Sequence, residues 1–152
     1  MGTTTTTATA RELVHGELTR EIIGAFFDVY NELGFGFLEA VYQRALPMAL
    51  AERGIESRRE VPLTVHFRGQ PIGDYRADLV VDGRVIVETK AAEKIIPVHE
   101  LQLLTYLRAT KLTVGLLLNF GPRPTFRRLI LSSPQEGRWS SGCDPRRSAI
   151  PL

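Results

Sequence analysis

Two short runs of strand-forming residues, joined by Asp82-Gly83, constrain the fold of this chain more than any other segment. Residues 79–81 and 85–87 are leucine, isoleucine or valine, whose bulky side chains favour extended backbone. An Asp-Gly pair between two such runs is a strong hairpin signal, because glycine tolerates the positive φ that tight hairpin turns require. We therefore predict a hairpin whose strands cover residues 73–81 and 84–90.

Charged residues stand at the open end of this hairpin. Asp78 precedes the first apolar run, and Glu88 and Lys90 follow the second. Folding back at the turn brings Asp78 toward Glu88 and Lys90, and strand alternation points Glu88 and Lys90 to one face of the sheet. The sequence thus predicts that two carboxylates and an ammonium group converge at the rim of an apolar sheet.

This group of side chains suits a divalent metal ion. Mg²⁺ and Mn²⁺ prefer oxygen ligands and usually keep several waters, so Asp78, Glu88 and the backbone carbonyl of Thr89 form a suitable donor set. Such an ion polarises a phosphoryl oxygen and lowers the pKa of a bound water. Lys90 would orient that water or stabilise charge that develops on the phosphate. The alternative is a surface salt bridge between Lys90 and a carboxylate, with no metal.

The order of the predicted elements indicates an α/β fold. Apolar residues recur at helical spacing over 17–33, 38–53 and 98–110, and extended patterns cover 61–67, 113–120 and 126–131 besides the hairpin. Pro47 inside the second helix predicts a kink or a break. Two helices, three strands, a helix and two strands favour a mixed sheet with helices packed on it. We expect one domain over residues 11–131, with a flexible lead (1–10) and a flexible tail (132–152).

Composition restricts the partners and the compartment only loosely. The 152 residues carry a net charge of +2, which permits a nucleic-acid partner without arguing for one. Cys143 is the only cysteine, so we expect neither a disulfide framework nor a cysteine metal site. No apolar run is long enough to span a bilayer and no signal pattern is visible, so we expect a cytoplasmic protein without a membrane partner. Three arginine pairs are candidate phosphate contacts or plain solvated surface: Arg58-Arg59, Arg127-Arg128 and Arg146-Arg147.

Two polar side chains mark one face of the third predicted helix. Gln102 and Tyr106 are four residues apart, at the edge of a face on which Leu101, Leu104 and Leu107 supply the core. Gln102 can hydrogen-bond a phosphate or a water, and Tyr106 can hold a carboxylate or stack on a base. Alternatively, Tyr106 is a half-buried core aromatic and Gln102 is solvated, and the sequence leaves both interpretations open.

A spaced glycine, glutamate and tyrosine motif opens the second predicted helix. Gly36, Glu39 and Tyr42 lie three residues apart, and a carboxylate in a first helical turn is favoured by the helix dipole regardless of function. Residues 33–46 resemble the signature of the GxxExxY protein family, and residues 75–81, 87–91, 98–107 and 115–121 agree with it in order. The resemblance covers roughly residues 18–131. That family is placed in the PD-(D/E)XK nuclease superfamily.

The resemblance implies a restriction-endonuclease-like mixed β-sheet flanked by helices, with an intact active site. The residues that match its functional positions are Asp78, Glu88 and Lys90 as catalytic residues, Glu39 from the N-terminal helix, and Gln102 and Tyr106 as the Gln-x-x-x-Tyr motif of exonuclease-like branches.

Thr89 and His99 are not among the catalytic side chains that the resemblance implies. Thr89 stands where the family usually carries an apolar residue, and we expect its side chain to face away from Glu88 and Lys90 and to affect packing more than chemistry. His99, just inside the third helix, is left out of the catalytic set because a histidine there more often caps or packs.

We therefore predict a Mg²⁺- or Mn²⁺-dependent nuclease, a phosphodiesterase that hydrolyses nucleic acid, with DNA as the favoured substrate. Asp78, Glu88 and the Thr89 carbonyl would bind the metal, Lys90 would assist, and Glu39 would support the metal or Lys90. One alternative is a catalytically silent nuclease-fold module that only binds nucleic acid or a protein partner. Another is an assembly subunit, in a homodimer or a larger complex, that uses residues 34–37 and the Phe120 loop as its interface.

Overall fold

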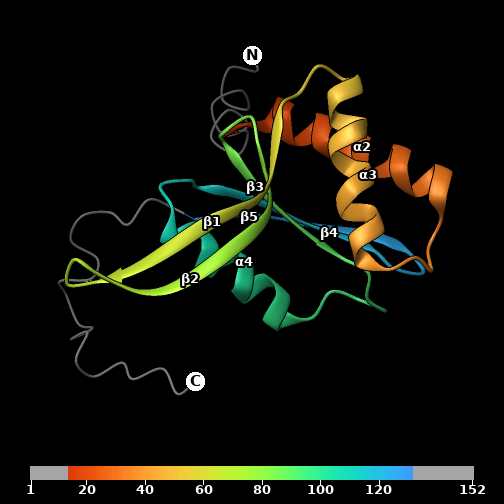
Figure 1. The fold of residues 1–152 in the computed structure, drawn as a ribbon. Coiled ribbons are helices and arrows are strands. Elements are labelled where there is room, and N and C mark those ends of the chain that lie inside the picture. Colours follow the sequence, from red (N-terminus) through yellow and green to blue (C-terminus); the bar gives the residue numbers. More distant parts are fainter. Residues whose placement is uncertain (1–13, 132–152) are drawn as a thin grey trace, which may run out of the picture.

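A five-stranded sheet with helices on both faces forms the body of the protein (Figure 1). The computed structural model describes residues 14–131. Helices α2 (Gly16–Leu33) and α3 (Glu39–Glu52) come first, followed by strands β1 (Ser57–Phe67), β2 (Gln70–Val81) and β3 (Val85–Lys90). Helix α4 (Pro97–Ala109) then leads to β4 (Val114–Phe120) and β5 (Pro124–Ile130). The predicted order of elements and the mixed α/β class are confirmed.

Some predictions fall outside the described residues. These are the flexible lead, the flexible tail, Cys143 and the pair Arg146-Arg147. Within residues 14–131, no helix is both long enough and apolar enough to cross a membrane.

The strands are ordered in space as they are in sequence, β1-β2-β3-β4-β5. Every neighbouring pair is antiparallel except β3 and β4, which run parallel because α4 connects them. In this parallel pair Lys90 lies opposite Asn119 at the carboxyl ends of both strands. Ligand sites in α/β sheets commonly form outside the carboxyl ends of strands, so the topology puts the charged end of β3 in a favourable place.

The hairpin turn between β2 and β3 has the predicted geometry. Asp82 and Gly83 both have positive φ, 51° and 64°. Aspartate and glycine tolerate this left-handed conformation better than most residues, which explains why the chain reverses here. The hairpin signal in the sequence is therefore confirmed.

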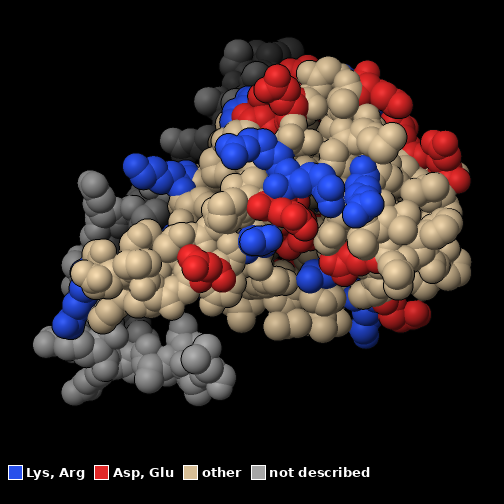
Figure 2. Space-filling view, in the orientation of Figure 1, with Lys and Arg blue, Asp and Glu red and all other residues tan. Residues whose placement is uncertain are grey.

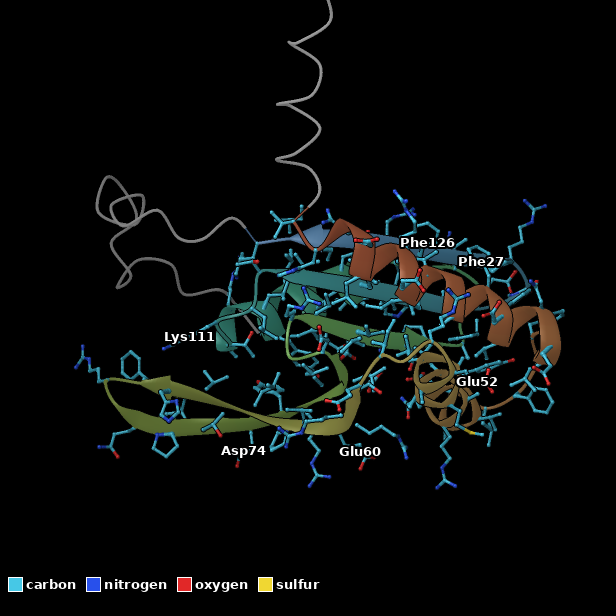
Figure 3. The ribbon with its side chains drawn as sticks, turned by 90° about the horizontal axis from the view of Figure 1, so that it is seen from above. Phe27, Glu52, Glu60, Asp74, Lys111 and Phe126 are labelled. Atoms are coloured by element: carbon cyan, nitrogen blue, oxygen red, sulfur yellow. The ribbon has the colours of Figure 1, made fainter. Side chains whose placement is uncertain are left out.

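The core lies in two layers, one on each face of the sheet. Helices α2 and α3 pack on one face, where the Tyr42 ring stacks on Phe120 at 4.3 Å and the Phe26 ring meets Phe120 edge-on at 4.7 Å. Phe27 of α2 similarly reaches Phe126 of β5 at 6.3 Å (Figure 3). Helix α4 covers the other face, where Leu103 packs with Ile86 and its neighbours. Because both faces are covered, every residue of β4 is buried, as the predicted apolar run indicated.

Two details of the helices differ from the sequence expectations. Leu101 is 55% exposed, and the buried positions of α4 are Leu103, Tyr106 and Leu107, a set with three- and four-residue spacing that excludes Leu101. Pro47 does not break α3, which continues to Glu52. A proline removes only one backbone hydrogen bond, and the packing of Leu46 and Leu50 on either side of it holds the helix together.

Phe120 is the aromatic side chain on which α2, α3 and the sheet meet, so its truncation should be costly. We expect Phe120→Ala to lower the free energy of unfolding by about 3–5 kcal/mol, measured by urea titration, because it leaves a cavity between two other rings. The matched control is Phe67→Ala, which removes a 58% exposed ring near the tip of the β1–β2 hairpin. Equal losses in the two variants would contradict this account of the core.

Candidate active site

The open end of the β2–β3 hairpin brings Asp78 and Glu88 into direct contact. The backbone ladder between these strands stops at Leu79 opposite Val87. Beyond it, carboxylates take the place of backbone partners: the Asp78 amide donates to Glu88 Oε1 at 3.0 Å, and the Thr89 amide donates to Asp78 Oδ2 at 3.0 Å. The prediction that the turn brings Asp78 to Glu88 is confirmed, and the backbone itself holds both carboxylates in place.

Strand β1 has an irregularity at Glu60, which lies opposite Asp78 of β2. The β1–β2 register passes from Arg59 opposite Leu79 to Val61 opposite Ala77, and Glu60 and Asp78 are not paired. Glu60, labelled in Figure 3, has φ of 50°, a left-handed conformation that costs free energy in a residue with a side chain. Because of this local irregularity, Asp78 has no partner in the β1 register. Its amide group donates to the Glu88 carboxylate on the other side of β2.

Glu88 is a buried carboxylate beside a second carboxylate. Only 2% of its surface is exposed. Burial, and then the negative charge of Asp78, raise the pKa of Glu88 to about 8, while the nearby Lys90 ammonium lowers it. A cation placed between Asp78 and Glu88 would relieve this repulsion and favour the ionised form of Glu88.

The Thr89 side chain, which the sequence analysis expected to affect packing more than chemistry, forms a hydrogen bond with Asp78. Its side chain is buried, and its Oγ1 donates to Asp78 Oδ2 at 3.2 Å in addition to the bond from its amide. Asp78 therefore has one oxygen held by two donors of the same residue. The apolar residue usual at this position would lack the hydroxyl bond, so Thr89 affects the orientation of a candidate metal ligand and not only packing.

The donor set fits a hard divalent cation that keeps part of its water shell. Within residues 14–131 no cluster of three or more His, Cys, Asp or Glu side chains has a geometry suited to a metal ion. The oxygens available are the carboxylates of Asp78 and Glu88 and, as a candidate, the Thr89 carbonyl. Mg²⁺ and Mn²⁺ accept such a set because they complete their coordination with water, whereas ions that require an all-protein cage would not.

A hydrogen-bond chain links Lys90 to α4. The Lys90 ammonium donates to Gln102 Oε1 at 3.2 Å, and Gln102 Nε2 donates to the Tyr106 hydroxyl at 3.0 Å. Tyr106 is 6% exposed, and burial raises its pKa, so it is both a core aromatic and a polar partner. Tyr106 is thus a core aromatic, as one alternative expected, whereas Gln102 is held between Lys90 and Tyr106. A contact of either side chain with a phosphate, a water or a base stays a prediction.

Glu39 completes the charged surroundings from the first turn of α3. Burial raises its pKa, the Lys90 ammonium lowers it and the Asp78 carboxylate raises it again. Gln43 Nε2 donates to Glu39 Oε1 at 3.2 Å and fixes the side chain. The structure brings Glu39 within electrostatic reach of Asp78 and Lys90.

The remaining predicted contacts have structural partners. His99 Nδ1 accepts a hydrogen bond from the Ile96 amide at 3.3 Å, so His99 caps the start of α4 as expected, and burial and the Lys90 charge lower its pKa. Arg127 lies 3.3 Å from Glu100, and Arg128 donates to the Val14 carbonyl. Arg58 and Arg59 are exposed and stay candidates for phosphate contact.

Asn119 is a site residue to which the sequence analysis assigned no role. It is fully buried, and its side-chain amide forms two hydrogen bonds with the backbone of Ala92. Oδ1 accepts from the Ala92 amide at 2.9 Å, and Nδ2 donates to the Ala92 carbonyl at 3.0 Å. Gly121 leaves room for this contact, since a Cβ there would lie 2.1 Å from the Ala92 oxygen. Asn119 thereby fixes the chain two residues after Lys90. A single asparagine at the end of a buried apolar strand was the available signal, because a buried amide needs partners.

Tyr42 of the spaced motif has a structural contact set. It is fully buried, its hydroxyl donates to the Gly34 carbonyl at 2.6 Å, and the same hydroxyl accepts from the Phe37 amide at 3.3 Å. Tyr42 therefore closes the α2–α3 connection immediately before Glu39. Gly36 in this connection has φ of 113°, which favours glycine.

Fold and site together define a nuclease-like α/β domain, and comparison with known sequences agrees. The sequence model of the PD-(D/E)XK nuclease superfamily matches residues 16–129, more than half of the chain, and the chain belongs to this superfamily. Membership is consistent with a restriction-endonuclease-like fold. No curated protein matches the sequence.

A solved structure shares the fold. It is described as "Crystal structure of SSO0001", is 19% identical, and aligns with a TM-score of 0.50 over 62% of this chain and 51% of that chain. The chain thus spans about half the length of that structure, and the likeness shows the fold alone.

Titration of Glu88 should be visible in the stability of the metal-free protein. Its folded-state pKa lies above the ordinary value of 4.5, so its stabilising contribution is complete below about pH 4.5 and is lost as the pH rises through about 8. We expect the urea midpoint in EDTA to fall between about pH 6 and about pH 9 in the wild type, and to fall less in Glu88→Gln, which stays neutral. Parallel pH profiles of the two proteins would show that Glu88 is not the titrating group.

Proposed function

We propose that this chain is a Mg²⁺- or Mn²⁺-dependent nuclease that hydrolyses phosphodiester bonds, with DNA as the favoured nucleic acid. The observation that carries the proposal is the contact of Asp78 with the buried Glu88, in which backbone amides hold both carboxylates beside the Lys90 ammonium. A buried carboxylate whose pKa is raised by burial and by a neighbouring carboxylate, beside a cationic side chain, is typical of an active site. Membership of a nuclease superfamily supports the same chemistry.

Each residue of the site has a role in this proposal. Asp78 and Glu88, with the Thr89 carbonyl, would hold the metal ion, which supplies polarisation of the phosphate and a more acidic bound water. The Lys90 ammonium would stabilise charge that develops on the phosphate or orient the attacking water. Gln102 and Tyr106 would aim Lys90, because they already form its hydrogen-bond chain.

The negative charge of Glu39 would support Lys90 or the metal ion. Its carboxylate lies within electrostatic reach of Lys90, whose ammonium group lowers the pKa of Glu39. Glu39 stands with Gly36 and Tyr42 in the segment that resembles the GxxExxY family, and we propose that closer relationship within the superfamily. We also propose a cytoplasmic location, which a chain with one cysteine and no disulfide framework would tolerate.

The silent binding module remains the second candidate for a specific reason. A metal ion must displace a proton from Glu88 at neutral pH, since burial and Asp78 raise the pKa of Glu88 to about 8. A site with weak metal affinity would leave a nuclease fold that binds nucleic acid without cutting it. Binding that weakens steeply with salt, together with intact strands after incubation in Mn²⁺, would favour this second function.

Replacement of Lys90 separates catalysis from metal binding. We expect Lys90→Ala to keep Mn²⁺ binding and to lower the rate of strand cleavage at least about a hundredfold, because the charge that stabilises the phosphate is gone. The assay follows fluorescent DNA and RNA oligonucleotides, single-stranded and duplex, in Mn²⁺. The control is Lys94→Ala, which removes an exposed ammonium four residues along the chain. Cleavage at the wild-type rate in Lys90→Ala would remove Lys90 from the mechanism.

A further inference from the structure

The α2–α3 connection carries an exposed apolar surface beside the candidate site. Phe35 is 61% exposed, Phe37 48% and Leu38 80%, and residues 34–38 contain no charged side chain. In Figure 2 the surface over this connection, at the right of the view, is largely uncharged. Two solvated phenylalanine rings and a leucine in one short segment cost free energy in water unless something covers them.

The rings are held outward by a connection of fixed geometry. The Tyr42 hydroxyl bridges the Gly34 carbonyl at 2.6 Å and the Phe37 amide at 3.3 Å, and the Phe37 ring meets the Tyr42 ring edge-on at 6.2 Å. Tyr42 is itself fixed by its stack on Phe120. Positive φ at Gly34 and Gly36 completes the turn. The buried Tyr42 side chain therefore fixes the backbone and ring of Phe37 while half of Phe37 stays exposed to solvent.

This surface adjoins the candidate active site along the chain. Leu38 precedes Glu39, the first residue of α3, and Glu39 lies within electrostatic reach of Asp78 and Lys90. Phe37 and Leu38 directly precede Glu39, so a strand whose phosphate lies at Lys90 would have its neighbouring nucleotides on the side of the site from which this connection enters α3. What covers the rings is then expected to be part of the nucleic acid that the superfamily acts on.

The chemistry of the surface selects one state of that nucleic acid. A duplex presents phosphates and the edges of its grooves, which call for cations and hydrogen-bond donors, and residues 34–38 offer no charged group. Unpaired bases present flat apolar faces, and aromatic side chains stack on these faces with little regard to sequence. We propose that Phe35 and Phe37 form a stacking platform for unpaired bases next to the scissile phosphate, so that this site takes single strands or frayed ends in preference to intact duplex.

This inference rests on the proposed function for its geometry, but binding tests it without cleavage. We would measure fluorescence anisotropy of a labelled single-stranded DNA oligonucleotide and of the matching duplex in EDTA. The wild type is expected to bind the single strand at least about tenfold more tightly, and each of Phe35→Ala and Phe37→Ala to weaken that binding by about tenfold, as the loss of one stacked base does. Phe67→Ala, which removes an exposed ring near the tip of the β1–β2 hairpin, is expected to bind like the wild type.

Substitution by leucine and by tyrosine distinguishes stacking from general apolar contact. Phe35→Leu and Phe37→Leu keep most of the apolar area and lose the flat ring, so they should bind single strands as weakly as the alanine variants. Phe35→Tyr and Phe37→Tyr keep the ring and should retain wild-type binding. A further variant, Tyr42→Phe, removes only the bridging hydroxyl and should weaken single-strand binding less than loss of a ring does.

The outcomes separate this inference from the proposed function. Ring-dependent binding of single strands without cleavage in Mn²⁺ would uphold the platform and overturn the nuclease. Cleavage at the same rate in the wild type, Phe35→Ala and Phe37→Ala, with equal binding of duplex and single strand, would uphold the nuclease and overturn the platform. Light scattering tests whether a second copy of the chain covers this surface. A wild-type dimer that dissociates in Phe35→Ala, together with DNA binding that is unchanged in both alanine variants, would assign the surface to a second copy and overturn the platform.

Discussion

The burial of Glu88 beside Asp78 is the constraint on which the rest of the site depends. A carboxylate with 2% exposure loses its hydration, and a second carboxylate at its side adds repulsion. The protein offsets this with donors from its own backbone, the Asp78 amide to Glu88 and the Thr89 amide to Asp78, which are free because the β2–β3 ladder ends one residue earlier. The pair is therefore built into the sheet, and a bound cation would relieve the repulsion between the two carboxylates.

Helices α4 and α3 and strand β4 each add one part to the surroundings of this pair. In α4, Gln102 accepts a hydrogen bond from the Lys90 ammonium and is itself bonded to Tyr106, and α3 brings Glu39 within electrostatic reach of Lys90. Strand β4 contributes Asn119, whose amide fixes the backbone at Ala92 just beyond Lys90. Because Phe120 and Tyr42 join β4 to α3 in the core, the same packing that stabilises the fold also fixes the α2–α3 connection that carries Phe35 and Phe37.

The features that could be predicted from sequence are those with a short-range or periodic cause. Asp82-Gly83 specifies a turn, a spacing of two puts Glu88 and Lys90 on one face, and a spacing of four puts Gln102 beside Tyr106. The features that could not be predicted depend on tertiary packing. Nothing local in the sequence indicates that Glu60 adopts a left-handed conformation opposite Asp78, that the Thr89 hydroxyl reaches a strand neighbour, or that α4 turns Leu103 inward and Leu101 outward.

The central claim is that Asp78 and Glu88 bind a divalent metal ion, and calorimetric titration of Mn²⁺ tests it without any assumption about the substrate. The wild type and Glu88→Gln would each be titrated near pH 7 in two buffers that differ in their enthalpy of ionisation. The account predicts that the wild type binds Mn²⁺ and releases a proton, since Glu88, with its pKa raised to about 8, must ionise on binding, and that Glu88→Gln shows neither effect. Equal Mn²⁺ binding by the two proteins, or binding by the wild type without proton release, would contradict it.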